Sequence, residues 1–152
     1  MSSRVVLAVF ALALASQPVA ADDEPVKKEV IEKMTAPRLE RLMKGLKVKL
    51  KEVEGKTDTY TFEFDKRTIL LFNSGNVLQA CVFYRDGDQV TSSRINEWNR
   101  KWRFTKVYMD EDKSLVFSSD YCLTGGVTED AVVAWMQRYV ASFKEFDKHF
   151  GD

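Results

Sequence analysis

Few residues of this chain have the type and spacing that catalysis requires. His149 is the only histidine, and no serine or cysteine signature of a nucleophile accompanies it. It lies near the end of a predicted helix, where the helix C-terminus stabilises a cation. We therefore interpret His149 as a helix-end residue. Because the sequence contains no recognisable catalytic set, we predict that the protein is not an enzyme.

Two other motifs resemble ligand sites but are incomplete. Asp110 to Asp112 begin like a calcium loop, yet Lys113 follows where a further ligand is needed, and no distal glutamate completes the loop. Gly125-Gly126 is too short for a phosphate-binding loop, so we interpret it as a turn into the last helix. Zinc requires three or four nitrogen or sulfur ligands, which one histidine and two distant cysteines do not supply. We expect no metal and no cofactor.

The first 21 residues predict an export signal. Arg4 is the only charge among them, an apolar run extends from Val5 to Ala15, and small residues precede the expected cleavage between Ala21 and Asp22. The run is shorter than the ~20 residues that a bilayer-spanning helix needs, so cleavage is favoured over a retained membrane tether. We expect an exported protein, in the bacterial periplasm or secreted.

The composition of the rest of the chain excludes two classes of partner. The whole chain has 23 Lys+Arg and 23 Asp+Glu, and these charges are spread along the sequence. Binding of nucleic acid through a basic surface is therefore disfavoured. No later apolar stretch is long enough to cross a bilayer, so no stable membrane insertion is expected after cleavage.

Beyond the signal, the sequence predicts a linker and one domain. Residues 22–34 are charged and predict a linker that can carry a short ordered end, and residues 35–152 predict a single α+β domain. Apolar residues recur at helical spacing in 35–46, 91–102 and 128–150. Thr35 can cap the first of these helices, residues 91–93 offer caps for the second, and the last begins at Thr128 with acidic residues in its first turn. Strand patterns occupy 48–50, 59–64, 69–72, 77–84, 104–109 and 114–123. The predicted order is α-β-β-β-β-α-β-β-α.

Two of these segments carry the predicted core. Ile69 to Phe72 is a continuous apolar run, which is typical of a central strand covered on both faces. The last helix has an apolar stripe that repeats every three or four residues over its whole length. Its members are Val132, Met136, Tyr139, Phe143, Phe146 and Phe150.

The two cysteines allow two interpretations. Strand alternation places Cys81 and Cys122 on faces that also carry apolar residues, as expected for buried free thiols. In an oxidising compartment the same two residues can instead form a disulfide, worth about 4 kcal/mol if the geometry allows it. Both alternatives remain open from the sequence.

The second predicted helix carries the candidate partner-binding residues. Trp98 and Trp102 are candidate contacts, although their spacing of four also suits a core stripe. Asn96 and Asn99 are three residues apart and share one side of the helix. They can recognise a partner or satisfy backbone groups, and the second use is the commoner one for buried asparagine.

The stretch from Arg94 to Asp130 resembles the YbjN domain family, which is described as bacterial sensory transduction regulators. The resemblance rests on Ile95-Asn96-Glu97-Trp98-Asn99-Arg100, on Arg103-Phe104, on the acidic turn Asp110 to Asp112 and on Gly125 to Thr128. It implies a fold like that of type III secretion chaperones, an antiparallel sheet flanked by helices that serves protein binding. The predicted order of elements agrees with this fold. The family supplies no established active site.

The sequence therefore predicts an exported, non-enzymatic module that binds another protein or itself, as a chaperone-like or regulatory domain. The alternative is a periplasmic small-ligand sensor with a pocket between the second helix and the sheet. A third hypothesis is an enzyme of unrecognised type. A pocket requires convergent polar groups in an apolar cleft, whereas a protein-binding module exposes an apolar patch.

Overall fold

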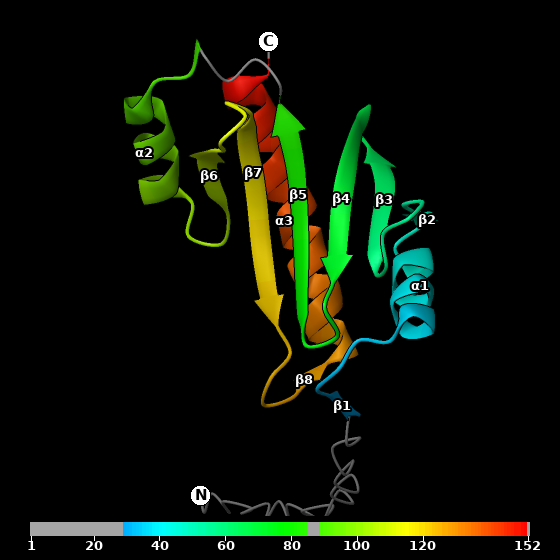
Figure 1. Cartoon of the computed structure of the whole chain (residues 1–152). Helices are drawn as coiled ribbons and strands as arrows, with labels where there is room; N and C mark the ends of the chain where they lie inside the picture. Colours follow the sequence, from blue (N-terminus) through cyan, green and yellow to red (C-terminus); the bar gives the residue numbers. More distant parts are fainter. Residues whose placement is uncertain (1–28, 85–88, 152) are drawn as a thin grey trace, which may run out of the picture.

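The computed structural model describes residues 29–84 and 89–151 (Figure 1). The predicted signal and most of the predicted linker lie outside this part. The helices are α1 (Ala36–Gly45), α2 (Ser92–Lys101) and α3 (Glu129–Phe150). The strands are β1 (Val30–Ile31), β2 (Lys51–Glu52), β3 (Thr59–Phe64), β4 (Arg67–Asn73), β5 (Val77–Tyr84), β6 (Lys106–Met109), β7 (Leu115–Cys122) and β8 (Val127–Thr128). The predicted α+β class and order are confirmed, with β1 and β8 as additions.

Six strands form one antiparallel sheet in the order β2-β3-β4-β5-β7-β6, and α3 runs along one face of it (Figure 1). In β4, Ile69 and Leu71 are fully buried, whereas Leu70 and Phe72 between them are only half-buried. The prediction that this strand is covered on both faces is wrong. Its apolar run is continuous because one set of side chains meets the helices and the other lies on the opposite, uncovered face.

The core lies between the sheet and the helices. Phe117 of β7 is fully buried, and its ring meets Tyr139 at 5.1 Å and Phe146 at 4.7 Å between centroids. The ring of Trp98 from α2 lies 6.0 Å from the same phenylalanine. The stripe predicted for the last helix is thus confirmed, with Phe150 half-buried at its end and Trp135 as a buried addition.

The predicted helix starts are confirmed at all three helices. The side chain of Thr91 accepts a hydrogen bond from the Arg94 amide, and that of Thr128 accepts one from the Ala131 amide. These bonds satisfy amides that have no partner inside the helix. Thr35 occupies the N-cap position of α1 without a capping side-chain bond.

The last residues of the predicted linker, for which a short ordered end is allowed, include the strand β1. β1 pairs with β8, with Val30 opposite Thr128, and Ile31 and Met34 are buried. The residues up to 34 therefore belong in part to the domain, because two apolar residues break their charged pattern. Gly126 permits this pairing, since it has a φ of +88° and an added Cβ would lie 2.3 Å from the Val30 Cγ1.

Candidate functional site

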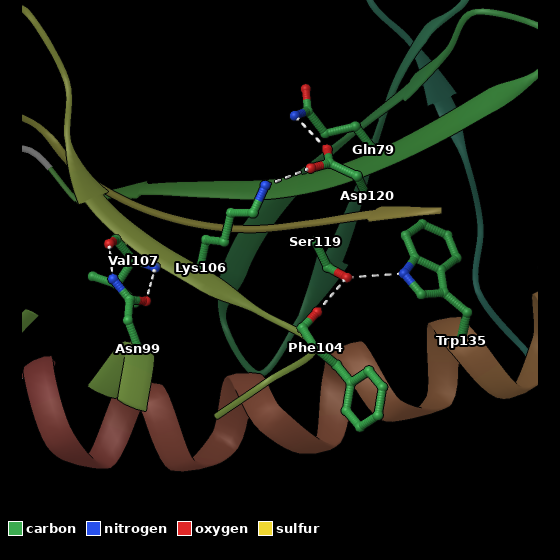
Figure 2. A network of polar contacts seen from close by, with 8 residues as sticks. All are labelled: Gln79, Asn99, Phe104, Lys106, Val107, Ser119, Asp120 and Trp135. Carbon is green, nitrogen blue, oxygen red and sulfur yellow. Dashed lines mark hydrogen bonds and ion pairs between the residues drawn. The ribbon is translucent and has the colours of Figure 1, made fainter. Parts of the chain in front are cut away.

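Asn99 closes one edge of the sheet. Its side-chain amide donates to the Val107 carbonyl at 2.8 Å, and its side-chain oxygen accepts from the Val107 amide at 2.9 Å (Figure 2). Val107 belongs to the edge strand β6, and both of its backbone groups point away from β7. The asparagine therefore occupies the place of a neighbouring strand. Of the two predicted uses of Asn99, this contact corresponds to the backbone-satisfying one.

The tryptophans of α2 belong mainly to the core. Trp98 is only 3 % exposed and donates through its indole nitrogen to Thr105, so the proposal that it contacts a partner needs correction. It points inward because its side chain is part of the stripe that meets Phe117. Trp102 is half-buried and stacks on Trp98 at 5.0 Å. Asn96, on the same helix, is exposed. Trp98 is therefore unavailable to a partner, whereas Trp102 and Asn96 stay candidate contacts.

A buried polar chain joins α3 to the sheet, and the sequence reading did not identify it. The Trp135 indole nitrogen donates to the Ser119 hydroxyl at 2.9 Å, and that hydroxyl donates to the Phe104 carbonyl at 2.8 Å (Figure 2). The Phe104 side chain is 64 % exposed, with the Arg138 guanidinium 4.5 Å from its ring centroid. Since each buried polar group has a partner, this chain is structural.

The uncovered face of the sheet, which we call the open face, carries apolar side chains at its centre. Phe83 of β5, Val116 of β7 and Tyr108 of β6 are opposite one another in the register. Val116 is buried between its neighbours, whereas Phe83 is 43 % and Tyr108 is 42 % exposed. Leu70 and Phe72 are half-buried on the same face. Phe83 and Tyr108, two of the most exposed large apolar side chains, therefore lie on either side of Val116 in one row across the sheet.

Polar groups lie beside this row on the open face. Asp120 of β7 accepts a hydrogen bond from the Gln79 side chain at 2.7 Å and pairs with the Lys106 ammonium at 3.5 Å (Figure 2). The three residues come from adjacent strands β5, β7 and β6. An apolar centre with polar neighbours is the usual composition of a protein interface.

Both cysteines are free, so the disulfide alternative is not realised. Cys122 lies opposite Val77, four residues along β5 from Cys81, which corresponds to roughly 13 Å. A disulfide needs Cα atoms within about 7 Å. Burial and the nearby Asp120 raise the pKa of the Cys81 thiol to about 12. Hydrogen bonds with Thr124 lower the pKa of the exposed Cys122.

The hollow nearest to the predicted ligand pocket lies between α2 and the end of α3. It has a volume of about 170 Å³ and is lined by Trp98, Trp102, His149 and charged side chains. Two of these charges, Glu145 and Lys148, pair with each other at 2.8 Å. Pockets for drug-sized ligands usually measure about 300 Å³ or more. The hollow is therefore a weak candidate for a sensor site.

The described residues offer neither a metal site nor a membrane-spanning helix. Residues 29–84 and 89–151 contain no group of three acidic, histidine or cysteine side chains placed to hold a metal. No helix among these residues is both long and apolar enough to cross a membrane.

His149 lies in the last turn of α3, with its ring 6.1 Å from that of Trp98.

Comparison with known proteins gives a family and a fold. The YbjN family model, described as "Putative bacterial sensory transduction regulator", matches residues 36–152. No curated protein matches the chain. A crystal structure of YbjN, "a putative transcription regulator from E. coli", is similar with a TM-score of 0.58 and 15 % identity, over 75 % of this chain and 87 % of that one. At this identity the likeness shows the fold alone.

The contact between Asn99 and Val107 generates the first prediction. Asn99→Ala leaves two backbone groups of the buried Val107 without partners, and we expect a loss of about 1–3 kcal/mol in the free energy of unfolding. Urea denaturation measures it. Asn96→Ala is the matched control on the same helix and should change stability by less than about 0.5 kcal/mol. Equal effects of the two substitutions would show that Asn99 does not close the edge.

The thiols generate a second prediction. Denatured, unreduced protein should yield two free thiols, whereas native protein should show one fast thiol, that of Cys122. Its lowered pKa raises the thiolate fraction at neutral pH, so its alkylation rate should level off at lower pH than for an ordinary cysteine. Burial raises the pKa of the Cys81 thiol to about 12 and shields it from the reagent, so it should react only after unfolding. Cys122→Ser should abolish the fast reaction; absence of free thiols after denaturation would contradict the structure.

Proposed function

Since this chain belongs to the YbjN family, we propose that it is a regulatory, non-enzymatic module that works by protein association through its open face. The exposed row formed by Phe83 and Tyr108 carries this proposal. Soluble monomers seldom expose large apolar patches, and such patches often mark interaction sites. Aromatic residues at the centre of a patch are also the residues that most often dominate binding energy.

We propose a second copy of the chain as the occupant of the open face. Charge favours this choice, because basic and acidic residues balance over the whole chain at 23 each. On the face itself, Lys106 and Asp120 offset each other. Two copies can therefore approach without net repulsion. Two twisted sheets can also pack face to face, and a two-fold axis makes such an interface self-complementary.

Sedimentation equilibrium of the paired variant Phe83→Ser/Tyr108→Ser tests the proposal. We expect the wild-type chain to dimerise and the variant to dissociate with a Kd raised by about tenfold or more, because two exposed aromatic contacts are lost. Phe104→Ser is the matched control, since Phe104 is more exposed but packs under Arg138 of α3. Circular dichroism checks that the variants fold. A wild-type chain that stays monomeric, or an equal effect of Phe104→Ser, would contradict the proposal.

We also propose that the module acts after export. The charge at Arg4, the apolar run from Val5 and the small residues before Asp22 support a cleaved signal. The first described strand begins at Val30, so cleavage before Asp22 removes none of the described residues. The intact mass of the exported protein should correspond to a chain that begins at Asp22. A mass that includes residues 1–21 would instead indicate a tethered protein.

A further inference from the structure

We propose that the edge of the sheet at β2 binds an acidic, extended segment of a partner protein, which adds a strand beside β2. We call this region the lysine edge and define it by Lys44, Lys47, Lys49 and Lys51. It lies at the opposite end of the sheet from β6, so it is distinct from the row that carries the proposed self-association.

The backbone of β2 has groups directed away from the sheet. Val53 donates to the Thr59 carbonyl at 2.9 Å, and Lys51 lies opposite Thr61 in the same ladder. In an antiparallel pair, residues alternate between positions that bond across the ladder and positions that point outward. Glu52 lies between two bonding positions, so its amide and carbonyl point away from β3. An outward-pointing amide and carbonyl are the template on which another strand can pair.

The two edges of the sheet differ in this respect. At β6 the corresponding backbone groups belong to Val107, and the Asn99 side chain occupies both. At β2 the corresponding groups belong to Glu52, and no hydrogen bond to its amide or carbonyl is found within residues 29–84 and 89–151. An incoming strand can therefore pair at β2 without displacing a side-chain partner like Asn99.

The charges of the lysine edge specify which strand fits. Lys47, Lys49 and Lys51 are exposed and alternate with the half-buried Val48 and Leu50. None of the four lysines forms an ion pair within residues 29–84 and 89–151. Only Lys51 belongs to β2, and Lys49 lies two residues before it, whereas Lys47 is at the end of α1 with a φ of 61°. Alternate residues of an extended chain lie about 7 Å apart, so carboxylates two positions apart in a partner match the spacing of Lys49 and Lys51.

A hollow beside the edge gives the partner room. It has a volume of about 420 Å³, and three lysines, Lys44, Lys47 and Lys49, outnumber the one acidic residue, Glu40, in its lining, which Val48 and Leu50 complete. Lysines on an edge strand also protect against aggregation, because most other strands cannot pair with a strand that carries several positive charges. An acidic strand is the kind that such lysines admit, since opposite charges across a ladder are stabilising.

Lys47 provides a variant that separates binding from folding. It has a φ of 61°, a conformation that glycine adopts more easily, and its amide donates to the Lys44 carbonyl at the end of α1. Lys47→Gly should therefore leave the stability unchanged or raise it while one positive charge is lost. A loss of peptide binding in this variant cannot be attributed to unfolding.

The test uses an eight-residue peptide of alternating aspartate and threonine, with binding measured by fluorescence anisotropy at low salt. We expect Lys49→Gln/Lys51→Gln to weaken binding about tenfold, and Lys47→Gly to weaken it by a smaller factor. Lys33→Gln/Lys66→Gln is the matched control with two exposed lysines elsewhere, and it should change the Kd less than about twofold. Two further peptides carry N-methyl groups on the odd-numbered or on the even-numbered backbone amides. Only one of these two peptides should lose binding, because only one set of amides faces β2.

Three results would overturn the proposal. They are no binding of the peptide to the wild-type chain, an equal rise in Kd for Lys33→Gln/Lys66→Gln and Lys49→Gln/Lys51→Gln, and unchanged binding of both methylated peptides. The last result would indicate attraction by charge without strand addition. Phe83→Ser/Tyr108→Ser should retain peptide binding, and Lys49→Gln/Lys51→Gln should retain self-association. The failure of either proposal is therefore distinguishable from the failure of the other.

Discussion

The ring of Phe117 holds two helices against the sheet, and the rest of the structure depends on this contact. Tyr139, Phe143 and Phe146 of α3 surround it at centroid distances of 5.1, 5.9 and 4.7 Å, and Trp98 of α2 reaches it at 6.0 Å. Because these rings all approach from one side, both helices lie on the same face of β7. The packing of the core thereby determines which face of the sheet is left uncovered.

Because the helices cover only one face of the sheet, its other face and its two edge strands are not covered by helices. Different side chains lie at each of these three places. At β6 a single asparagine side chain satisfies the backbone, which makes that edge a poor template for another strand. At and just before β2, exposed lysines such as Lys49 and Lys51 discourage the pairing of most other strands. The open face keeps Phe83 and Tyr108 partly in water, which is unfavourable unless another surface covers them. The association proposals follow from this division.

Periodicity predicted most elements, because local rules decide where helices and strands occur. The sequence could not show that only one face of β4 is covered, since a continuous apolar run is compatible with one or two packed layers. It also missed β1, whose two residues carry no strand pattern of their own and pair with β8 near Gly126. The candidate site was harder to predict. Whether Trp98 points into the core and Asn99 toward β6 depends on where the helix docks, which no local pattern encodes.

Trp98 and Asn99, which belong to the sequence motif of the family, both have structural roles. Adjacent residues of a helix project about 100° apart, so the same turn of α2 directs the indole toward Phe117 and the amide toward Val107. Both contacts dock α2 against the sheet. The sequence motif that includes these residues therefore describes how the domain is assembled. The residues that we propose for association lie outside Ile95–Arg100: Phe83 is on β5, Tyr108 on β6, and the lysine edge extends from Lys44 to Lys51. Membership in the family accordingly establishes the fold, while our proposals for a partner rest on the surface residues described above.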